Sequence, residues 1–166
     1  MVKITRANKQ HIPLIRELSE EIWAPTFAPI LTKQQIAYMM EMMYSPSSLK
    51  EQMSSGHEYI VAQRDKEIVG YLSYELNCGE SGKTKIHKLY ILPQHQRGGV
   101  GKAMVDYVAQ QALQANNSAL YLNVNKHNDK AIGFYKKHHF VLAKEEVIDI
   151  GKGFVMDDYV FELPLR

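Results

Sequence analysis

The chain has 166 residues, of which 45% are hydrophobic and 23% are charged, as expected for one ordinary globular domain spanning residues 1–166. With 20 basic and 18 acidic residues the formal net charge is only +2. Nucleic-acid-binding proteins usually carry a dense basic stripe, so no nucleic-acid partner is expected. No apolar run reaches the roughly 18 residues of a membrane span, and the single Cys78 cannot form an internal disulfide. We therefore expect a cytoplasmic protein without membrane contact.

The first third of the chain is predicted to form one strand followed by helices. Apolar periodicity and local signals predict four elements, a strand over 1–6 and helices over 9–22, 32–44 and 45–56. Pro25 is expected to end the first helix early, because proline disfavours helix in the residue before it. Thr32 and Ser45 have the side chains that cap the other two helices.

The rest of the chain predicts strands that alternate with two more helices. The strands are expected over 58–63, 68–76, 83–92, 119–124, 141–150 and 154–163, and the helices over 101–115 and 128–138. Hairpins followed by strand–helix–strand units imply a mixed sheet with helices on its faces, an α+β fold.

The most informative segment spans residues 87–102. An apolar strand stops at Pro93, a loop with three glycines follows, and an amphipathic helix begins at once. The free N–H groups of the first helical turn form an anion site suited to phosphate. Two known phosphate loops do not fit: Ala103 stands where a Walker A loop needs Ser or Thr, and Met104 replaces the third glycine of the dinucleotide fingerprint.

Two motifs resemble the GNAT superfamily of N-acetyltransferases. The first is Gln-x-x-Gly-x-Gly from Gln96 to Gly101, which is similar to that family's acyl-CoA pyrophosphate loop. The second is Asn-x-x-Ala-x-x-Phe-Tyr from Asn128 to Tyr135, which follows the strand over 119–124. The order of elements also resembles this family from end to end. His139 stands where the family usually has a glycine, so we expect a modified helix end there.

The resemblance implies the GNAT fold, with a mixed, mostly antiparallel sheet of about seven strands flanked by about four helices. It also implies acetyl-CoA as co-substrate. Carried over by position, the main chain of Leu89 and Ile91 would bind pantetheine and the Ile91 amide would stabilise the oxyanion. The residues expected to bind the cofactor are Leu89, Tyr90, Ile91, Gln96, Arg97, Gly98, Gly99, Val100, Gly101, Lys102, Asn128, Tyr135 and Lys137.

The resemblance places Tyr135 as the acid that assists departure of the thiol. For the base we favour His87, because strand alternation would place His87, Leu89 and Ile91 on one face. Glu75 on the preceding strand is the second candidate, and a water relay beside an interior His87 is an equal alternative. No metal is expected, since His138 and His139 are adjacent rather than at ligand spacing and no Cys or acidic cluster completes a set.

The acceptor is expected to be a small primary amine, because residues 153–160 resemble a bacterial branch that includes spermidine/spermine acetyltransferases. Alternatives are protein N-termini, lysine side chains or amino acids as acceptors, or a non-catalytic sensor that binds CoA. Asp157 and Asp158 could attract a cationic amine, but neighbours on a strand face opposite sides, so at most one is expected to face the cleft. Relatives are commonly homodimers, which makes a second copy an expected partner.

Overall fold

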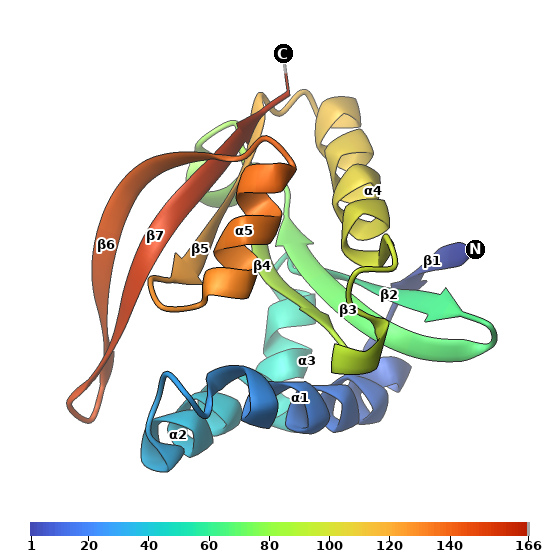
Figure 1. Ribbon diagram of the computed structural model, residues 1–166. Coiled ribbons are helices and arrows are strands. Elements are labelled where there is room, and N and C mark those ends of the chain that lie inside the picture. Colours follow the sequence, from blue (N-terminus) through green and yellow to red (C-terminus); the bar gives the residue numbers. More distant parts are fainter. Residues whose placement is uncertain (166) are drawn as a thin grey trace.

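The computed structural model describes residues 1–165 and shows one seven-stranded sheet with strand order β1-β2-β3-β4-β5-β7-β6 (Figure 1). The strands are β1 (Val2–Ala7), β2 (Glu58–Arg64), β3 (Glu67–Glu75), β4 (Thr84–Ile91), β5 (Ala119–Asn125), β6 (Val141–Gly151) and β7 (Phe154–Pro164). All neighbours pair antiparallel except β4 and β5, which pair parallel. The expected mixed, mostly antiparallel sheet is therefore confirmed.

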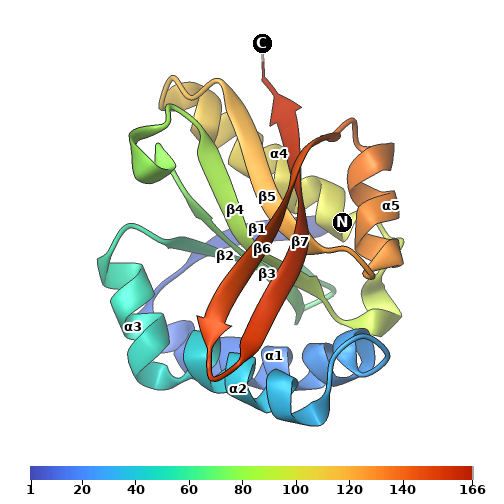
Figure 2. The ribbon, with the colours of Figure 1, turned by 90° about the vertical axis from the view of Figure 1, so that its left-hand side faces the viewer.

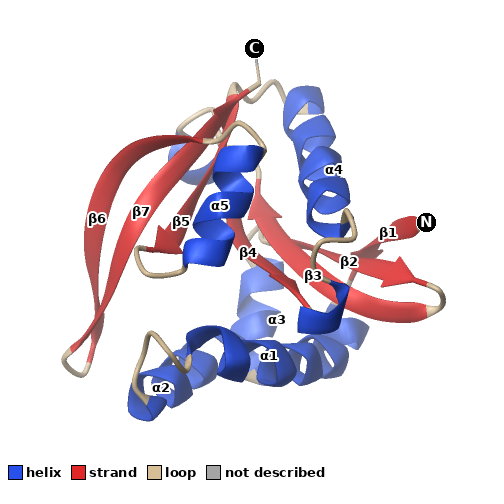
Figure 3. Ribbon diagram, in the orientation of Figure 1, coloured by secondary structure: helices blue, strands red, loops and turns tan. Residues whose placement is uncertain are grey.

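Five α-helices accompany the sheet in this part of the chain (Figure 3). They are α1 (Ile12–Phe27), α2 (Lys33–Tyr44), α3 (Pro46–Ser54), α4 (Val100–Gln114) and α5 (Asp129–Lys137). The predicted caps are confirmed: Thr32 accepts a hydrogen bond from the Gln35 amide at 3.1 Å, and Ser45 accepts one from the Ser48 amide at 3.2 Å. None of the described helices is long and apolar enough to cross a membrane.

The expected break in the first helix is wrong, because α1 continues through Pro25 to Phe27. Proline in a helix loses one hydrogen bond and crowds the preceding turn. Here the continued helix buries Trp23 and Phe27, which are 2% and 6% exposed and have ring centroids 4.5 Å apart. Burial of two large aromatic side chains outweighs the local cost of a proline in the last turn of the helix.

The helices form two layers around the sheet. Helices α1, α2 and α3 cover one face, and α4 and α5 lie on the other (Figures 1 and 2). On the α1 face, the buried Tyr71 of β3 hydrogen-bonds Ser19 of α1 and Tyr44 of α2. On the opposite face, Ile91 of β4 packs close to Gly101 of α4.

The sheet opens in its middle. Parallel pairing of β4 with β5 is confined to Thr84–Ile86 against Leu120–Leu122, although both strands continue beyond this region. The second half of β4 therefore keeps a partner only on its β3 side. The Leu92 amide donates to Val69 on β3 at 2.8 Å. Because hydrogen-bonding directions alternate along an antiparallel strand, the amides of Leu89 and Ile91 face the gap toward β5.

A β-bulge on β4 corrects the expected orientation of His87. Ser73 pairs with Lys88 and the next residue, Tyr74, pairs with Ile86, so His87 is the extra residue. An extra residue shifts the alternation of side chains by one position. His87 consequently lies beside Glu75 on β3, and not on the face where Ile91 packs toward α4.

Candidate active site

A cleft of about 380 Å³ opens along β4 where the sheet separates. It is bounded by residues of α1, α2, β4, β5, α5 and β7, and its wall on the α1–α2 side is mostly apolar. The wall includes Trp23, Phe27, Leu31, Met39, Met42 and Met43. Tyr38 of α2 lies outside this cleft, and its hydroxyl donates to the Ile150 carbonyl at 2.5 Å. Of the predicted site residues, His87, Leu89, Tyr90, Asn128 and Tyr135 line this cleft.

The glycine-containing loop lies at the other end of β4, between Ile91 and α4. Gly99 precedes the helix with φ +81°, the left-handed region that favours glycine, and its carbonyl accepts the first helical hydrogen bond from Ala103 at 3.0 Å. The amides of the first turn before Ala103 have no helical partner, which gives the expected helix N-terminus. Arg97 also has a positive φ of 70° and is exposed.

Side chains around this loop fix its shape. Arg64 on β2 donates a hydrogen bond to the Gly98 carbonyl, and Gln96 donates to the Ile91 carbonyl at 3.3 Å. Lys102 forms an ion pair with Asp106 one turn later, at 2.7 Å. The Gln96 contact satisfies the Ile91 carbonyl and leaves the Ile91 amide facing the gap.

These features fit an acyl-CoA molecule. Two main-chain amides face an open strand gap, a helix N-terminus lies just beyond the end of the same strand, and a partly apolar cleft continues from the gap. A pantetheine arm can pair with the strand as a peptide would, and a diphosphate is the kind of anion a helix N-terminus accepts. When bound, acetyl-CoA supplies the activated acetyl group as a thioester.

Tyr135 on α5 reaches the cleft from the side of β7. It is 7% exposed and packs against Phe134, Phe140 and Phe161. Burial raises the pKa of the Tyr135 hydroxyl above its usual range. Tyr135 therefore stays protonated at neutral pH and can act as a donor.

Two of the other predicted cofactor residues, Asn128 and Tyr90, have structural contacts of their own. The Asn128 side chain caps α5 by accepting from the Ala131 amide at 3.3 Å, while the residue also lines the cleft. The Tyr90 ring packs against Trp23, Phe27 and Tyr71 in the core, and its main chain pairs with Tyr71 on β3. A cofactor contact of Tyr90 therefore stays a prediction. Lys137 is exposed in the last turn of α5.

The expected modification of the helix end at His139 is not found, because α5 ends in the usual way. His139 follows α5 with φ +73°, a left-handed conformation usually taken by glycine at helix C-termini. The neighbouring Phe140 amide still bonds back to the Tyr135 carbonyl at 3.0 Å. His139 thus takes the conformation that a glycine usually supplies at this point, at a cost in backbone strain.

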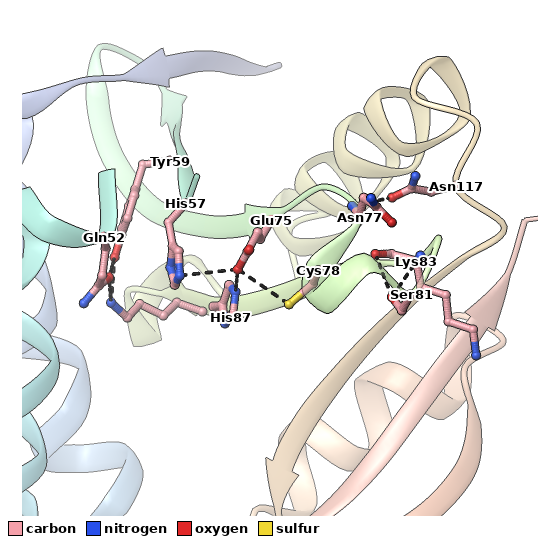
Figure 4. A network of polar contacts seen from close by, with 11 residues as sticks. Gln52, His57, Tyr59, Glu75, Asn77, Cys78, Ser81, Lys83, His87 and Asn117 are labelled. Carbon is pink, nitrogen blue, oxygen red and sulfur yellow. Dashed lines mark hydrogen bonds and ion pairs between the residues drawn. The ribbon is translucent and has the colours of Figure 1, made fainter. Parts of the chain in front are cut away.

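The two candidate bases are in direct contact. His87 Nε2 lies 3.0 Å from Glu75 Oε1, and the Cys78 thiol also donates to this oxygen at 3.5 Å (Figure 4). A third group, His57, was not expected: its Nε2 lies 3.5 Å from the same oxygen. His57 immediately precedes β2, and only the register of Glu58 with Tyr74 brings it beside Glu75. The sequence gives no direct signal for that register.

The environment sets the charge states of this group. Burial lowers the pKa of His87 to about 4, the nearby His57 acts in the same direction, and the hydrogen bond to Glu75 opposes them. Burial acts to raise the pKa of Glu75, but the hydrogen bonds from His87 and Cys78 outweigh it and the pKa lies below its usual range. At neutral pH the pair is a neutral imidazole beside a carboxylate.

His57, Glu75 and His87 place three ligand-type atoms within 4.8 Å of one another. However, the two imidazole rings are stacked, with centroids 4.1 Å apart and planes 10° from parallel. Lone pairs lie in the plane of an imidazole ring, so stacked rings direct them side by side and not to one point. His87 is hydrogen-bonded to Glu75, and His57 Nε2 lies at a longer distance of 3.5 Å from the same oxygen. The expectation that no metal takes part stays a prediction.

Lys88 is a buried cation that the sequence did not single out. It is 5% exposed, and its ammonium donates to Gln52 and Tyr59 at 2.6 Å each and to the Met43 carbonyl at 3.3 Å. Its Nζ also lies 4.6 Å from the centre of the Tyr44 ring. Burial lowers the pKa of Lys88 to about 7.

Of the two adjacent aspartates, only Asp158 lines the cleft, which confirms that at most one does so. Asp158 is 2% exposed and accepts a hydrogen bond from Asn123 at 3.3 Å. Burial raises the pKa of Asp158. Asp157 instead forms an ion pair with Lys126 at 2.9 Å.

Comparisons with known proteins agree with this geometry. The model of the acetyltransferase (GNAT) family matches residues 15–140. An uncharacterized N-acetyltransferase of Lactobacillus delbrueckii is 23% identical over 156 residues, covering 90% of each chain. A spermidine N(1)-acetyltransferase of Thermoplasma acidophilum is 20% identical over 161 residues, covering 94% of this chain and 96% of the relative. The crystal structure of PaiA N-acetyltransferase from Thermoplasma acidophilum in complex with coenzyme A shares the fold, with a TM-score of 0.82, 18% identity and 99% coverage of both chains.

Proposed function

Because the chain belongs to the GNAT acetyltransferase family, and is thus an N-acetyltransferase that uses acetyl-CoA, we propose that it transfers the acetyl group directly to a small primary amine within the cleft along β4. The observation that carries the proposal is the gap between β4 and β5. It leaves the amides of Leu89 and Ile91 free beside a cleft that contains both His87 and Tyr135.

The amine must lose a proton before it attacks. A primary amine with pKa near 10.4 is neutral in only about one molecule per thousand at pH 7, a cost of about 4–5 kcal/mol. A further proton leaves once the nitrogen has bonded to the acetyl carbon. His87 is neutral at this pH and can accept this proton, while Glu75 stabilises the imidazolium that forms. The expected base is thus retained, with Glu75 as its partner.

The thiolate must be stabilised as it leaves. A thiol pKa near 8.5 lies about 1.5 units below an ordinary tyrosine, and burial of Tyr135 widens that difference. Full proton transfer from Tyr135 to sulfur is therefore uphill by more than about 2 kcal/mol. We propose that Tyr135 donates a strong hydrogen bond to the developing thiolate, and that the Ile91 amide donates to the oxyanion.

A polyamine is the first acceptor to test. Its support is the full-length similarity to a spermidine acetyltransferase and the carboxyl group of Asp158 in the cleft. A second candidate is an amine that carries its own anionic group, such as an amino acid or a peptide N-terminus. Lys85 favours it, since Lys85 lines the same cleft and forms no ion pair within residues 1–165.

The test is release of free CoA thiol across a panel of polyamines, amino acids, aminoglycosides and peptides. For a polyamine acceptor we expect Asp158→Asn to raise the KM for spermidine at least tenfold and Asp157→Asn, its matched control, to leave it unchanged. For an anionic acceptor we expect Lys85→Met to raise the KM instead. Tight CoA binding without thiol release from any amine would contradict catalysis and favour a CoA sensor.

The role of His87 has its own test. We expect His87→Gln to remove the acidic limb of the pH–rate profile, because glutamine cannot take up the proton. An acidic limb that stays at the same pH in this variant would exclude His87 as the base and favour a water relay.

We also propose a cytoplasmic homodimer. Cys78 is a free thiol, which fits a reducing compartment. Strand β6 forms one edge of the sheet and exposes Val141, Leu142 and Val147, and an exposed edge strand with apolar side chains is a pairing surface. Light scattering at micromolar concentration should give twice the chain mass, and Val147→Lys should lower it.

A further inference from the structure

Two histidines share one carboxylate oxygen at this site. His87 Nε2 and His57 Nε2 lie 3.0 and 3.5 Å from Glu75 Oε1, and the rings stack face to face (Figure 4). We infer that His57 is a positioning residue for His87, holding the Glu75 carboxylate and the His87 ring in the one arrangement that leaves His87 ready to accept a proton. The inference rests on the proposed function for the role of His87 as base.

The surroundings of His57 fix where its own proton lies. Its Nδ1 is buried and has no hydrogen-bond partner within residues 1–165. A buried N–H without an acceptor costs about 1–3 kcal/mol, so Nδ1 carries no proton and the neutral ring keeps its proton on Nε2. The protonated nitrogen is thus Nε2, which lies 3.5 Å from Glu75 Oε1. Burial also lowers the pKa of His57, which keeps the ring neutral.

The same carboxylate orients His87. With Nε2–H of His87 directed at Glu75, the second ring nitrogen, Nδ1, is the one with a free lone pair. The β-bulge removes the regular strand geometry at His87. Stacking against His57 restricts rotation of the His87 ring where the main chain does not.

His57 also tunes the basicity of His87. The charged or titratable groups around the His87 ring are Glu75 from β3, Cys78 from the turn after β3, His57 before β2, and Lys85 and Lys88 on β4 itself. Tyr121 of β5 lies beside Glu75 and Cys78. Removal of His57 takes away a neighbour that disfavours protonation of His87, and leaves Glu75 with His87 and Cys78 as its remaining partners. The pKa of His87 must then rise.

Two substitutions separate the ring from its N–H group. His57→Phe keeps a flat ring that can stack but has no donor, and His57→Gln keeps a donor without the ring. His127→Phe is the matched control, because His127 is exposed in the loop before α5. The pH dependence of kcat/KM is measured for each protein with EDTA present, and ring titration is followed by nitrogen-detected NMR without substrate. Thermal unfolding confirms that each variant is folded.

In His57→Phe we expect the His87 ring to titrate at a pH higher by roughly one unit, and the acidic limb of kcat/KM to move with it. The KM for acetyl-CoA should stay within twofold, and His127→Phe should behave as wild type. His57→Gln should shift the His87 ring titration and the acidic limb of kcat/KM less than His57→Phe does.

An unchanged His87 titration and an unchanged acidic limb in His57→Phe would overturn the inference. If the titration midpoint of the His87 ring moves while the acidic limb of kcat/KM stays at the same pH, the catalytic role of His57 and His87 is overturned. Failure of the proposed function gives a different result, because the wild-type protein then releases no CoA thiol with any amine. The NMR titration needs no substrate, so it still decides whether His57 controls the pKa of His87.

Discussion

Gly101 at the start of α4 lies directly against the Phe134 ring of α5. A Cβ atom at Gly101 would be 2.9 Å from two carbons of this ring and 3.3 Å from Ile91 Cδ1. One glycine thus allows α4, α5 and β4 to approach one another. Because Phe134 precedes Tyr135, this contact also helps to set where the candidate acid lies.

Gly101→Ala should therefore act mainly on stability, whereas Gly99→Ala should act mainly on cofactor binding. Gly101→Ala crowds the Phe134 ring and should lower the free energy of unfolding by about 1–3 kcal/mol. Gly99 has open space around its Cβ position but φ +81°, so Gly99→Ala should cost about 1 kcal/mol of strain and raise the KM for acetyl-CoA. Urea unfolding and initial rates measure both. Equal KM values for wild type and Gly99→Ala would contradict the assignment of the loop.

Tyr135→Phe should lower kcat about 10–1000-fold, because the phenol that stabilises the leaving thiolate is lost. The CoA dissociation constant, measured by calorimetry, should change less than threefold, since the ring and its packing remain. Tyr107→Phe on α4 is a suitable control with the same chemical change outside the cleft. If Tyr135→Phe retains full kcat, the tyrosine is only a packed aromatic residue.

His87 should make the protein sensitive to acid. Its pKa is about 4 in the folded protein and near 6.5 when unfolded, so between these values the unfolded chain binds the extra proton. Stability should then fall as the pH drops from 6.5 to 4, by up to about 3 kcal/mol. Chemical denaturation at several pH values tests this. His87→Gln should show a shallower decline, and a parallel decline would place the acid sensitivity elsewhere.

Lys88 should make the stability of the protein depend on pH above pH 7. Its pKa is about 7 when folded and near 10.4 when unfolded, so the unfolded chain binds more protons between these values. Stability should rise from pH 7 to pH 10, by a few kcal/mol. Lys88→Met should remove this slope. Lys50→Met, at an exposed lysine of α3, is the control; a slope that persists in Lys88→Met would exclude Lys88 as its source.

Much of the fold could be predicted because the signals are local. Thr32 and Ser45 cap their helices with their own side chains, and the alternating strands are bounded by turn residues. Tertiary packing explains the failures. Burial of Phe27 carries α1 through Pro25, and an extra residue in β4 turns His87 away from the expected face. Neither effect is visible in a local pattern.

Part of the site could also be predicted, because some of its residues belong to local sequence motifs. Tyr135 and Asn128 belong to one motif, and His87 and Glu75 were proposed independently and prove to be in contact. His57 and Lys88 were missed. Their roles depend on which strands are neighbours and on burial, as in the contact of Lys88 with Tyr59 across the sheet. The cofactor roles assigned to residues 96–102 stay predictions.

The short pairing between β4 and β5 has a thermodynamic consequence. Three register pairs join the half-sheet of β1–β4 to that of β5–β7, so this seam is a natural place for the two halves to move apart. A thioester arm lying along β4 would act as an inserted strand that ties them together. Saturating coenzyme should thus slow amide hydrogen exchange on both sides of the seam and raise the melting temperature in proportion to the logarithm of its concentration.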